Sequence, residues 1–347
     1  MPKPSCSLSL DLDNLWSYLK THGDAGWDEY PSYLEIVVPR VLKFLGDRGL
    51  TITWFIVGKD ADVPSHHAVL KSLVEAGHEV GNHSFHHEPW LHLYSEAEID
   101  GELARTEDAI EHATGVRPDM FRGPGFSHSP TLLNVLARRG YRFDASTFPT
   151  FLGPIARLYY FATAKGLTDE EKQKRKKLFG KFADGFGPLK PYRWTTPSGP
   201  LLEIPVTTMP LFKVPIHLSY LLYLAGYSPW LARLYWRFAL RMCKTFGVEP
   251  SLLLHPLDFM GSDDTDRLSF FPAMQKPSSL KLQWCGQFFD MLQHRYRCIP
   301  MGEHAAEIER RNLTVRPSAP TAPSRRPVPA ESPSSTGSIP LHPAPQR

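Results

Sequence analysis

The sequence predicts an α/β fold made of parallel βα units, arranged either as a barrel or as a doubly wound sheet. Short apolar runs rich in β-branched and aromatic residues alternate with helical segments through the first half of the chain. Polar, Gly or Pro residues follow each run, as they do where strands end and turns begin. In parallel α/β folds such strand ends share one rim, which is where functional side chains gather.

The expected elements follow one another in order up to residue 144. Pro39 and Gly49 flank one expected helix, since Pro favours the first turn and Gly the position after the last. Ser95 and Glu98 form a capping box that opens another. The expected strands are 7–12, 50–57, 78–81, 118–122 and 141–144, and the expected helices are 39–47, 65–76, 96–113 and 129–139.

The alternation breaks at Phe148. Residues 149–200 are expected to form an insertion with a solvated helix around the charged run 169–177. Expected strands return at 201–206, 250–254 and 297–301, with a helix at 279–294. From Thr314 onward nine of the last 34 residues are Pro, and many others are Ser, Ala or Thr, so we predict that residues 314–347 are disordered.

Residues 210–242 are dense in Leu, Tyr and Trp, with Lys213 and three arginines dispersed among them. Two interpretations stay open. The segment is a pair of helices that cover the sheet, or it is an amphipathic surface that contacts a membrane from one side.

Composition limits the class of protein. With 42% hydrophobic and 22% charged residues, the chain can bury a sizeable core, and a net charge of +3 gives no reason to expect nucleic acid as a partner. The four cysteines show no CxxC spacing, and the first residues run directly into an expected strand. We therefore expect a cytoplasmic protein with reduced thiols.

Two motifs suggest a metal site. His83 and His87 are four residues apart, and on a helical turn both imidazoles would reach one metal ion. A third ligand is expected from Asp11 or Asp13, which follow the first strand and point to the same side of an extended segment. The alternatives are a His-rich surface turn and an Asp/Asn turn or cap.

Three further motifs end expected strands. Arg122, Gly125 and Phe126 lie in the loop FRGPGF, which suits an exposed backbone N–H and an arginine that binds a carboxylate. Asp144 begins DAS after the fifth strand, and His255 ends the apolar run LLLHP. Taken singly, a lone His after a core strand is more often structural than catalytic.

The ordered series DLDN, HSFHH, RGPG, DAS and LLLHP resembles the five motifs of the NodB-homology polysaccharide deacetylases, over residues 5–305. The resemblance implies a distorted (β/α) barrel and the hydrolysis of N-acetyl groups on an amino sugar. It implies that Asp13, His83 and His87 bind a divalent metal, either Zn²⁺ or Co²⁺. The first motif departs from the pattern of many members, because Leu12 separates the two aspartates.

The resemblance also implies catalytic roles. Asp11 would be the general base, oriented by Arg122, and the metal would act as a Lewis acid on the acetyl carbonyl. His255 would protonate the departing amine, with Asp144 fixing its tautomer. A backbone N–H at Gly125 would hold the oxyanion, and Phe126 would line the substrate site.

The expected partner is an N-acetylated glycan, either free or lipid-linked. A membrane contact through 210–242 would place the enzyme at the inner face of the membrane. Two other functions stay open: an allantoinase-like hydrolase of a small amide, and a catalytically silent glycan-binding protein.

Overall fold

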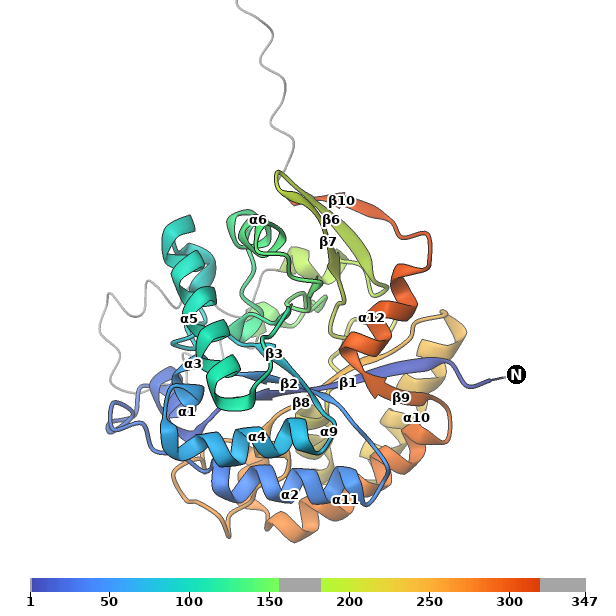
Figure 1. Ribbon diagram of the computed structural model, residues 1–347. Coiled ribbons are helices and arrows are strands. Elements are labelled where there is room, and N and C mark those ends of the chain that lie inside the picture. Colours follow the sequence, from blue (N-terminus) through green and yellow to red (C-terminus); the bar gives the residue numbers. More distant parts are fainter. Residues whose placement is uncertain (1, 156–181, 319–347) are drawn as a thin grey trace, which may run out of the picture.

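The computed structural model describes residues 2–155 and 182–318. Strands and helices alternate along the chain, as the sequence predicts, and the helices surround a central sheet (Figure 1). The strands are β1 Ser5–Leu12, β2 Thr53–Ile56, β3 Glu79–Asn82, β4 Met120–Phe121, β5 Phe143–Asp144, β6 Tyr192–Thr196, β7 Gly199–Glu203, β8 Ser251–Leu254, β9 Arg297–Pro300 and β10 Val315–Pro317. The helices are α1 Leu15–His22, α2 Leu34–Gly46, α3 Gly58–Ala61, α4 His67–Glu75, α5 Glu96–Thr114, α6 Pro130–Arg138, α9 Leu218–Tyr227, α10 Pro229–Thr245, α11 Ser278–Gln293 and α12 Met301–Glu309.

The strands curl into a distorted barrel. Their order is β10-β6-β7-β5-β4-β3-β2-β1-β8, and β9 pairs with the first half of β1. The neighbours from β8 to β7 run parallel, and only the β6–β7 hairpin is antiparallel. The segment after β7 closes the ring, because Thr207 N–H donates to the Ser251 carbonyl at 3.0 Å. This is the α/β barrel class expected from the sequence.

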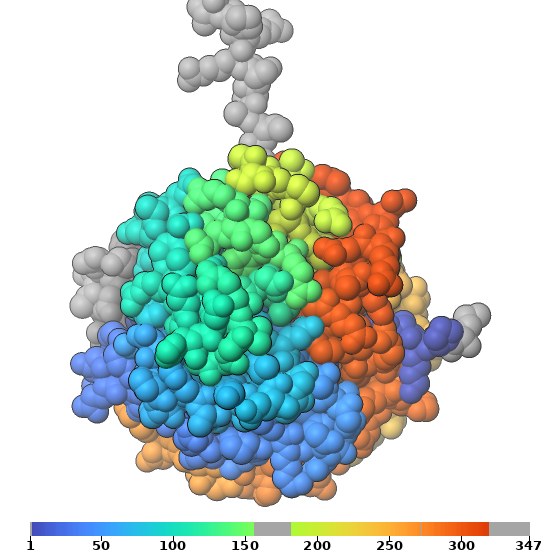
Figure 2. Space-filling view, in the orientation of Figure 1, coloured from blue at the N-terminus to red at the C-terminus, as the bar shows by residue number. Residues whose placement is uncertain are grey.

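The main hydrophobic core lies between the sheet and the helices that cover it. It combines β1, β2 and β8, whose residues are buried on both faces, with the apolar faces of α2, α4, α10 and α11. Figure 2 shows one face of the molecule closed by helices coloured blue to green and by the orange C-terminal segment.

Local sequence signals place several helix ends. Ser95 and Glu98 make the expected capping box at the start of α5. Ser129 caps α6 by accepting a hydrogen bond from Leu132 N–H. The expected start of the helix 39–47 is wrong. The observed helix, α2, begins at Leu34, and Pro39 lies inside it. Apolar burial of this first turn outweighs the backbone hydrogen bond that Pro39 cannot make.

The expectations for two other segments need correction. Residues 192–203 belong to the β6–β7 hairpin rather than to a helical insertion. The predicted helix around 169–177 lies outside the described residues. Val315–Pro317 form β10 against β6, so the start of the expected disordered tail is ordered.

Within the described ranges, no helix has both the length and the apolar character needed to cross a bilayer. All four cysteines are free thiols. Residues 210–242 do contain a pair of helices, α9 and most of α10, which pack on each other.

Gly81 lets β3 pack closely on β2. A Cβ at this position would lie 2.6 Å from Cδ1 of Phe55 and 3.2 Å from the Met120 carbonyl oxygen. We expect Gly81→Ala to lower the free energy of unfolding by about 1–3 kcal/mol, through overpacking. Gly101→Ala in α5 is the control, because its Cβ would meet no atom within 4 Å, and it should stabilise by about 0.5–1 kcal/mol. Denaturant unfolding measures both, and equal effects would contradict the packing argument.

Candidate metal centre and active site

The parallel register brings the predicted motifs to one rim of the barrel. Leu10 pairs with Leu254, Ile56 with Asn82 and Phe121 with Asp144, so the strands end at a common level. These carboxyl ends carry Asp11, Asp13, His83, Arg122, Asp144 and His255.

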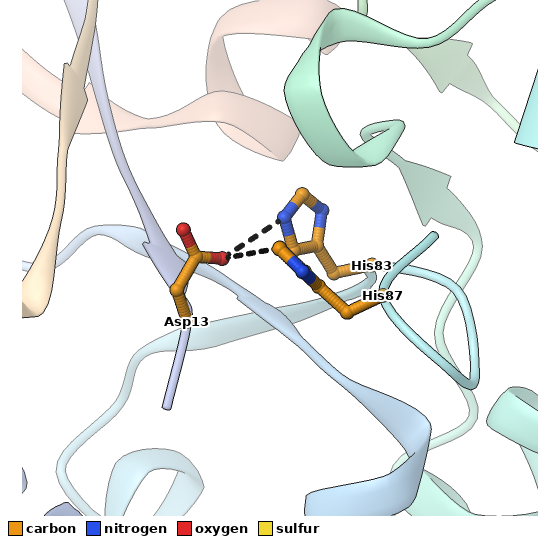
Figure 3. A group of neighbouring side chains, drawn as sticks. All are labelled: Asp13, His83 and His87. Carbon is orange, nitrogen blue, oxygen red and sulfur yellow. Dashed lines mark ion pairs between the residues drawn. The ribbon is translucent and has the colours of Figure 1, made fainter. Parts of the chain in front are cut away.

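Asp13, His83 and His87 form a compact buried cluster (Figure 3). One carboxylate oxygen, Asp13 Oδ1, lies 3.2 Å from His83 Nε2 and 2.9 Å from His87 Nε2. One ligand atom from each residue lies within 4.8 Å of the others. Two imidazole nitrogens and one carboxylate oxygen are the donor set of many hydrolytic zinc sites.

The donor set fits a cation. His83 Nδ1 donates to the Arg122 carbonyl oxygen at 2.7 Å, which turns Nε2 toward Asp13. Asp13 Oδ1 is buried without a hydrogen bond from any described residue. A buried acceptor of this kind is costly unless a positive charge satisfies it.

The pKa values in the cluster reflect this charge balance. Burial alone would raise the pKa of Asp13, but the adjacent His87 and His83 hold it well below its usual range. Burial opposes protonation of His83, yet the charges of Asp11 and Asp13 raise its pKa. The cluster is therefore arranged around positive charge at the imidazole nitrogens.

The two histidines do not lie on a helical turn, as the sequence analysis assumed. Ser84 and His87 have positive φ values of 60° and 51°, so a tight loop after β3 brings the rings together. Glu102 of α5 anchors this loop by accepting hydrogen bonds from Phe85 and His86 N–H at 3.0 Å. The sequence analysis missed Glu102, because no local pattern links it to a loop 16 residues away.

Arg122 is fully buried and binds Asp11. Its Nη1 donates to Asp11 Oδ1 at 2.9 Å and to Ser9 Oγ at 2.8 Å, and its Nε donates to the Ala145 carbonyl at 3.0 Å. The second oxygen, Asp11 Oδ2, lies 4.0 Å from His83 Nε2 and therefore faces the metal cluster. The geometry holds this carboxylate in a fixed orientation beside the cluster.

Asp144 does not pair with His255, which corrects the expected contact. It accepts a hydrogen bond from Ser146 Oγ, which in turn accepts one from Gly123 N–H at 2.8 Å. Asp144 thus anchors the RGPG loop. Its buried neighbour Glu203 accepts from Thr147 and Trp194, and burial together with the Asp144 charge raises the pKa of Glu203 well above its usual range.

His255 is oriented by a different pair of residues. Its Nδ1 lies 3.1 Å from Oγ of Ser219, in the first turn of α9. Ser219 also hydrogen-bonds the buried Asp258. The Asp258 carboxylate accepts a hydrogen bond from the backbone N–H of His255 at 2.8 Å. Asp258 and Ser219 therefore take the positioning role that the sequence analysis gave to Asp144.

Gly125 and Phe126 form a strained turn beside the site. Both have positive φ values, 58° for Gly125 and 62° for Phe126. The turn uses the N–H groups of Phe126 and Ser127, so among its described contacts the Gly125 N–H is left for a ligand. The Phe126 ring stacks on Phe148 at 4.5 Å, and Phe148 lies 5.9 Å from the ring of His217. These rings form one aromatic wall.

His217 is a buried residue that the sequence analysis missed. Its ring lies 5.9 Å from that of His255, and burial together with the His255 charge lowers its pKa well below the usual range. It is therefore a neutral imidazole in the wall.

A family model covers part of the chain. Residues 24–143 match the model of the family described as polysaccharide deacetylase. This part of the chain, about a third of it, is similar to the polysaccharide deacetylase family. The matched residues include His83, His87 and Arg122, while Asp13 and His255 lie outside them.

Curated relatives match over part of their length. A peptidoglycan deacetylase of Helicobacter pylori is 28% identical over 144 residues, which are 40% of this chain and 47% of that protein. A peptidoglycan-N-acetylmuramic acid deacetylase of Bacillus subtilis is 31% identical over 105 residues, 30% of this chain and 39% of that protein. The chain thus spans less than half of these relatives.

A solved structure of a putative polysaccharide deacetylase from Mycobacterium smegmatis matches with a TM-score of 0.60. It covers 93% of this chain and 95% of its own, at 19% identity. This likeness shows that both proteins share one fold.

The Asp144–Glu203 pair should make stability depend on pH. Because the pKa of Glu203 is raised in the folded state, the folded chain holds a proton that the unfolded chain releases above about pH 4.3. The contribution of Glu203 to the free energy of unfolding is present at low pH. It is lost as the pH rises toward the pKa of Glu203 in the folded state. We expect wild type to lose stability relative to Glu203→Gln between about pH 5 and 8, by up to ~1.4 kcal/mol per pH unit.

Thermal unfolding across this pH range measures the difference, with Glu29→Gln at an exposed site as the control. A constant offset between wild type and Glu203→Gln at every pH would contradict the prediction.

Proposed function

We propose that this protein is a metal-dependent hydrolase that removes N-acetyl groups from amino sugars of a glycan. The observation that carries the proposal is the buried Asp13–His83–His87 cluster, with the Asp11–Arg122 pair 4.0 Å from it. Neither glycan binding alone nor a structural role requires a base, a buried arginine and a metal-type donor set at one rim. The names of the curated relatives support the choice of N-acetylated glycan.

Asp13, His83 and His87 would hold the divalent cation, and the donor set suits Zn²⁺ or Co²⁺. A cation held there would supply Lewis-acid chemistry, polarising an acetyl carbonyl and acidifying a water molecule. Asp11 is the general base, because Oδ2 faces the cluster while Oδ1 is held by Arg122. The Arg122 cation keeps the Asp11 carboxylate oriented with a free oxygen for the proton.

His255 is the general acid that protonates the departing amine. It stands on β8, beside the strand that carries Asp11, so acid and base approach a substrate from neighbouring strands. Ser219 binds His255 Nδ1, which leaves Nε2 for the leaving group. The Gly125 N–H would hold the oxyanion, and the wall of Phe126, Phe148 and His217 would line the sugar site.

Acetate release from N-acetylglucosamine oligomers tests the function. We expect activity to disappear on chelation and to return with Zn²⁺ or Co²⁺. The reason is that Asp13, His83 and His87 supply one anionic and two neutral donors, and a bound cation would supply the positive charge that balances them. Asp13→Ala should lower the bound metal, while Asp11→Asn should keep it and lower kcat about 10²–10⁴-fold. Activity that survives chelation, or acetate released only from a small non-sugar amide, would overturn the proposal.

Ser219 provides a test of the corrected partner of His255. We expect Ser219→Ala to lower kcat with little change in KM or in metal content, because the hydroxyl orients the acid rather than the substrate. Ser219→Thr should restore the rate, since it keeps the hydroxyl. Loss of activity in both variants, with a lowered melting temperature, would indicate a structural role instead.

A further inference from the structure

Helices α9 and α10 expose a large apolar surface, called here the α9–α10 surface. The two helices have 10 and 17 residues, yet they carry seven of the 18 large hydrophobic side chains that are exposed in the described part of the chain. Such a concentration marks an interaction surface rather than ordinary scatter. The seven are Tyr220, Tyr223, Tyr227, Trp230, Leu231, Leu234 and Phe238.

The same surface is basic. The sequence of α10 contains no Asp or Glu and four cations, and among the described residues three of them, Arg237, Arg241 and Lys244, make no salt bridge. The fourth, Arg233, donates to Gln287 of α11 at 3.0 Å. Elsewhere on the described surface several arginines are paired with acids, as Arg117 and Arg139 are. The charge on α10 is therefore left for an external partner.

Apolar and basic side chains run side by side along α10. Trp230, Leu234 and Phe238 are four residues apart, and so are Arg233, Arg237 and Arg241, so each set forms a line on adjoining parts of one helix face. A groove of about 600 Å³ separates α10 from α11, with Trp230, Arg233 and Arg237 on the α10 side. Asp290 is the acidic residue of its α11 side.

We propose that the α9–α10 surface binds the headgroup region of an anionic phospholipid membrane. Trp and Tyr side chains favour the interface between lipid and water, and arginines beside them can reach anionic headgroups while their stems cover apolar surface. Trp230 is 66% exposed, and it is the one exposed residue among the eight tryptophans of the chain, all of which are described. The helices lie flat against the barrel next to α11, so binding is peripheral (Figure 1).

A second copy of the chain is the less favourable occupant. A symmetric dimer through this face would bring the four cations of one α10 against the four cations of the other. Helix α10 contains no Asp or Glu to balance them. An anionic bilayer instead supplies the opposite charge over the whole surface.

The surface continues to the active-site rim through α9. Tyr220 packs edge-on against His217 at 4.6 Å, and the preceding residue, Ser219, holds His255. A membrane-bound molecule would thus have its acid-bearing rim near the bilayer. The membrane proposal does not rest on the proposed hydrolase activity, because the surface is defined without the catalytic residues.

Co-sedimentation of the full chain with vesicles tests the proposal. We expect binding to phosphatidylcholine vesicles that contain phosphatidylglycerol, much weaker binding to pure phosphatidylcholine, and loss of binding in high salt. The tryptophan emission should shift to shorter wavelength on binding, and Trp230→Phe should remove that shift. Inorganic phosphate at millimolar concentration should not compete, since the partner is a surface rather than a free anion.

Paired variants separate charge from insertion. Arg237→Glu with Arg241→Glu should weaken binding by at least about tenfold, and so should Leu234→Ser with Phe238→Ser. The matched controls, Lys43→Glu with Lys71→Glu and Ile36→Ser with Val116→Ser, should bind as wild type does. The proposal is overturned by absent binding at low salt, by equal loss in the controls, or by self-association that buries Trp230 without lipid.

Discussion

The buried guanidinium of Arg122 is the interaction on which the site depends. Its donors reach Ser9 and Asp11 on β1 and the carbonyl of Ala145 after β5, so it joins strands from opposite sides of β4. Its own carbonyl accepts from Nδ1 of His83. One residue therefore fixes the direction of the base and of a metal ligand together, and a buried charge of this kind is tolerated only because each partner is in place.

Charge balance supports the proposal that the cluster holds a cation. Arg122 neutralises Asp11, which leaves Asp13 as a second buried carboxylate beside two imidazoles. The carboxylates of Asp11 and Asp13 raise the pKa of His83, and His87 and His83 lower the pKa of Asp13, so the acids and imidazoles of the cluster favour each other's charged forms. In the proposed metal site a divalent cation would bind the imidazole nitrogens in place of protons, so metal binding would be linked to proton release.

The sequence predicted those features that depend on local or periodic patterns. The apolar runs gave the parallel strands, and Ser95 with Glu98 gave the start of α5, because each signal lies within a few residues. The partners of buried polar groups could not be predicted in this way. Ser219 is 36 residues from His255 and Glu102 is 16 from His86, and only the packing of α9 and α5 brings them together. The same limit produced the wrong partner for Asp144.

Two parts of the barrel thus hold two groups of residues: the proposed metal ligands with the base, and the proposed acid. The proposed metal ligands and the proposed base are held by β1, the loop after β3 and Arg122, which are all buried. The proposed acid, His255, follows β8 and is held by a hydroxyl from α9, a helix whose outer side exposes three tyrosines. Asp11 and Arg122 are buried among strands. His255 is held by Ser219 on α9, a helix whose outer face is exposed. Helix α9 therefore contacts His255 directly through Ser219, and its exposed Tyr220 packs on His217, whose ring lies 5.9 Å from that of His255.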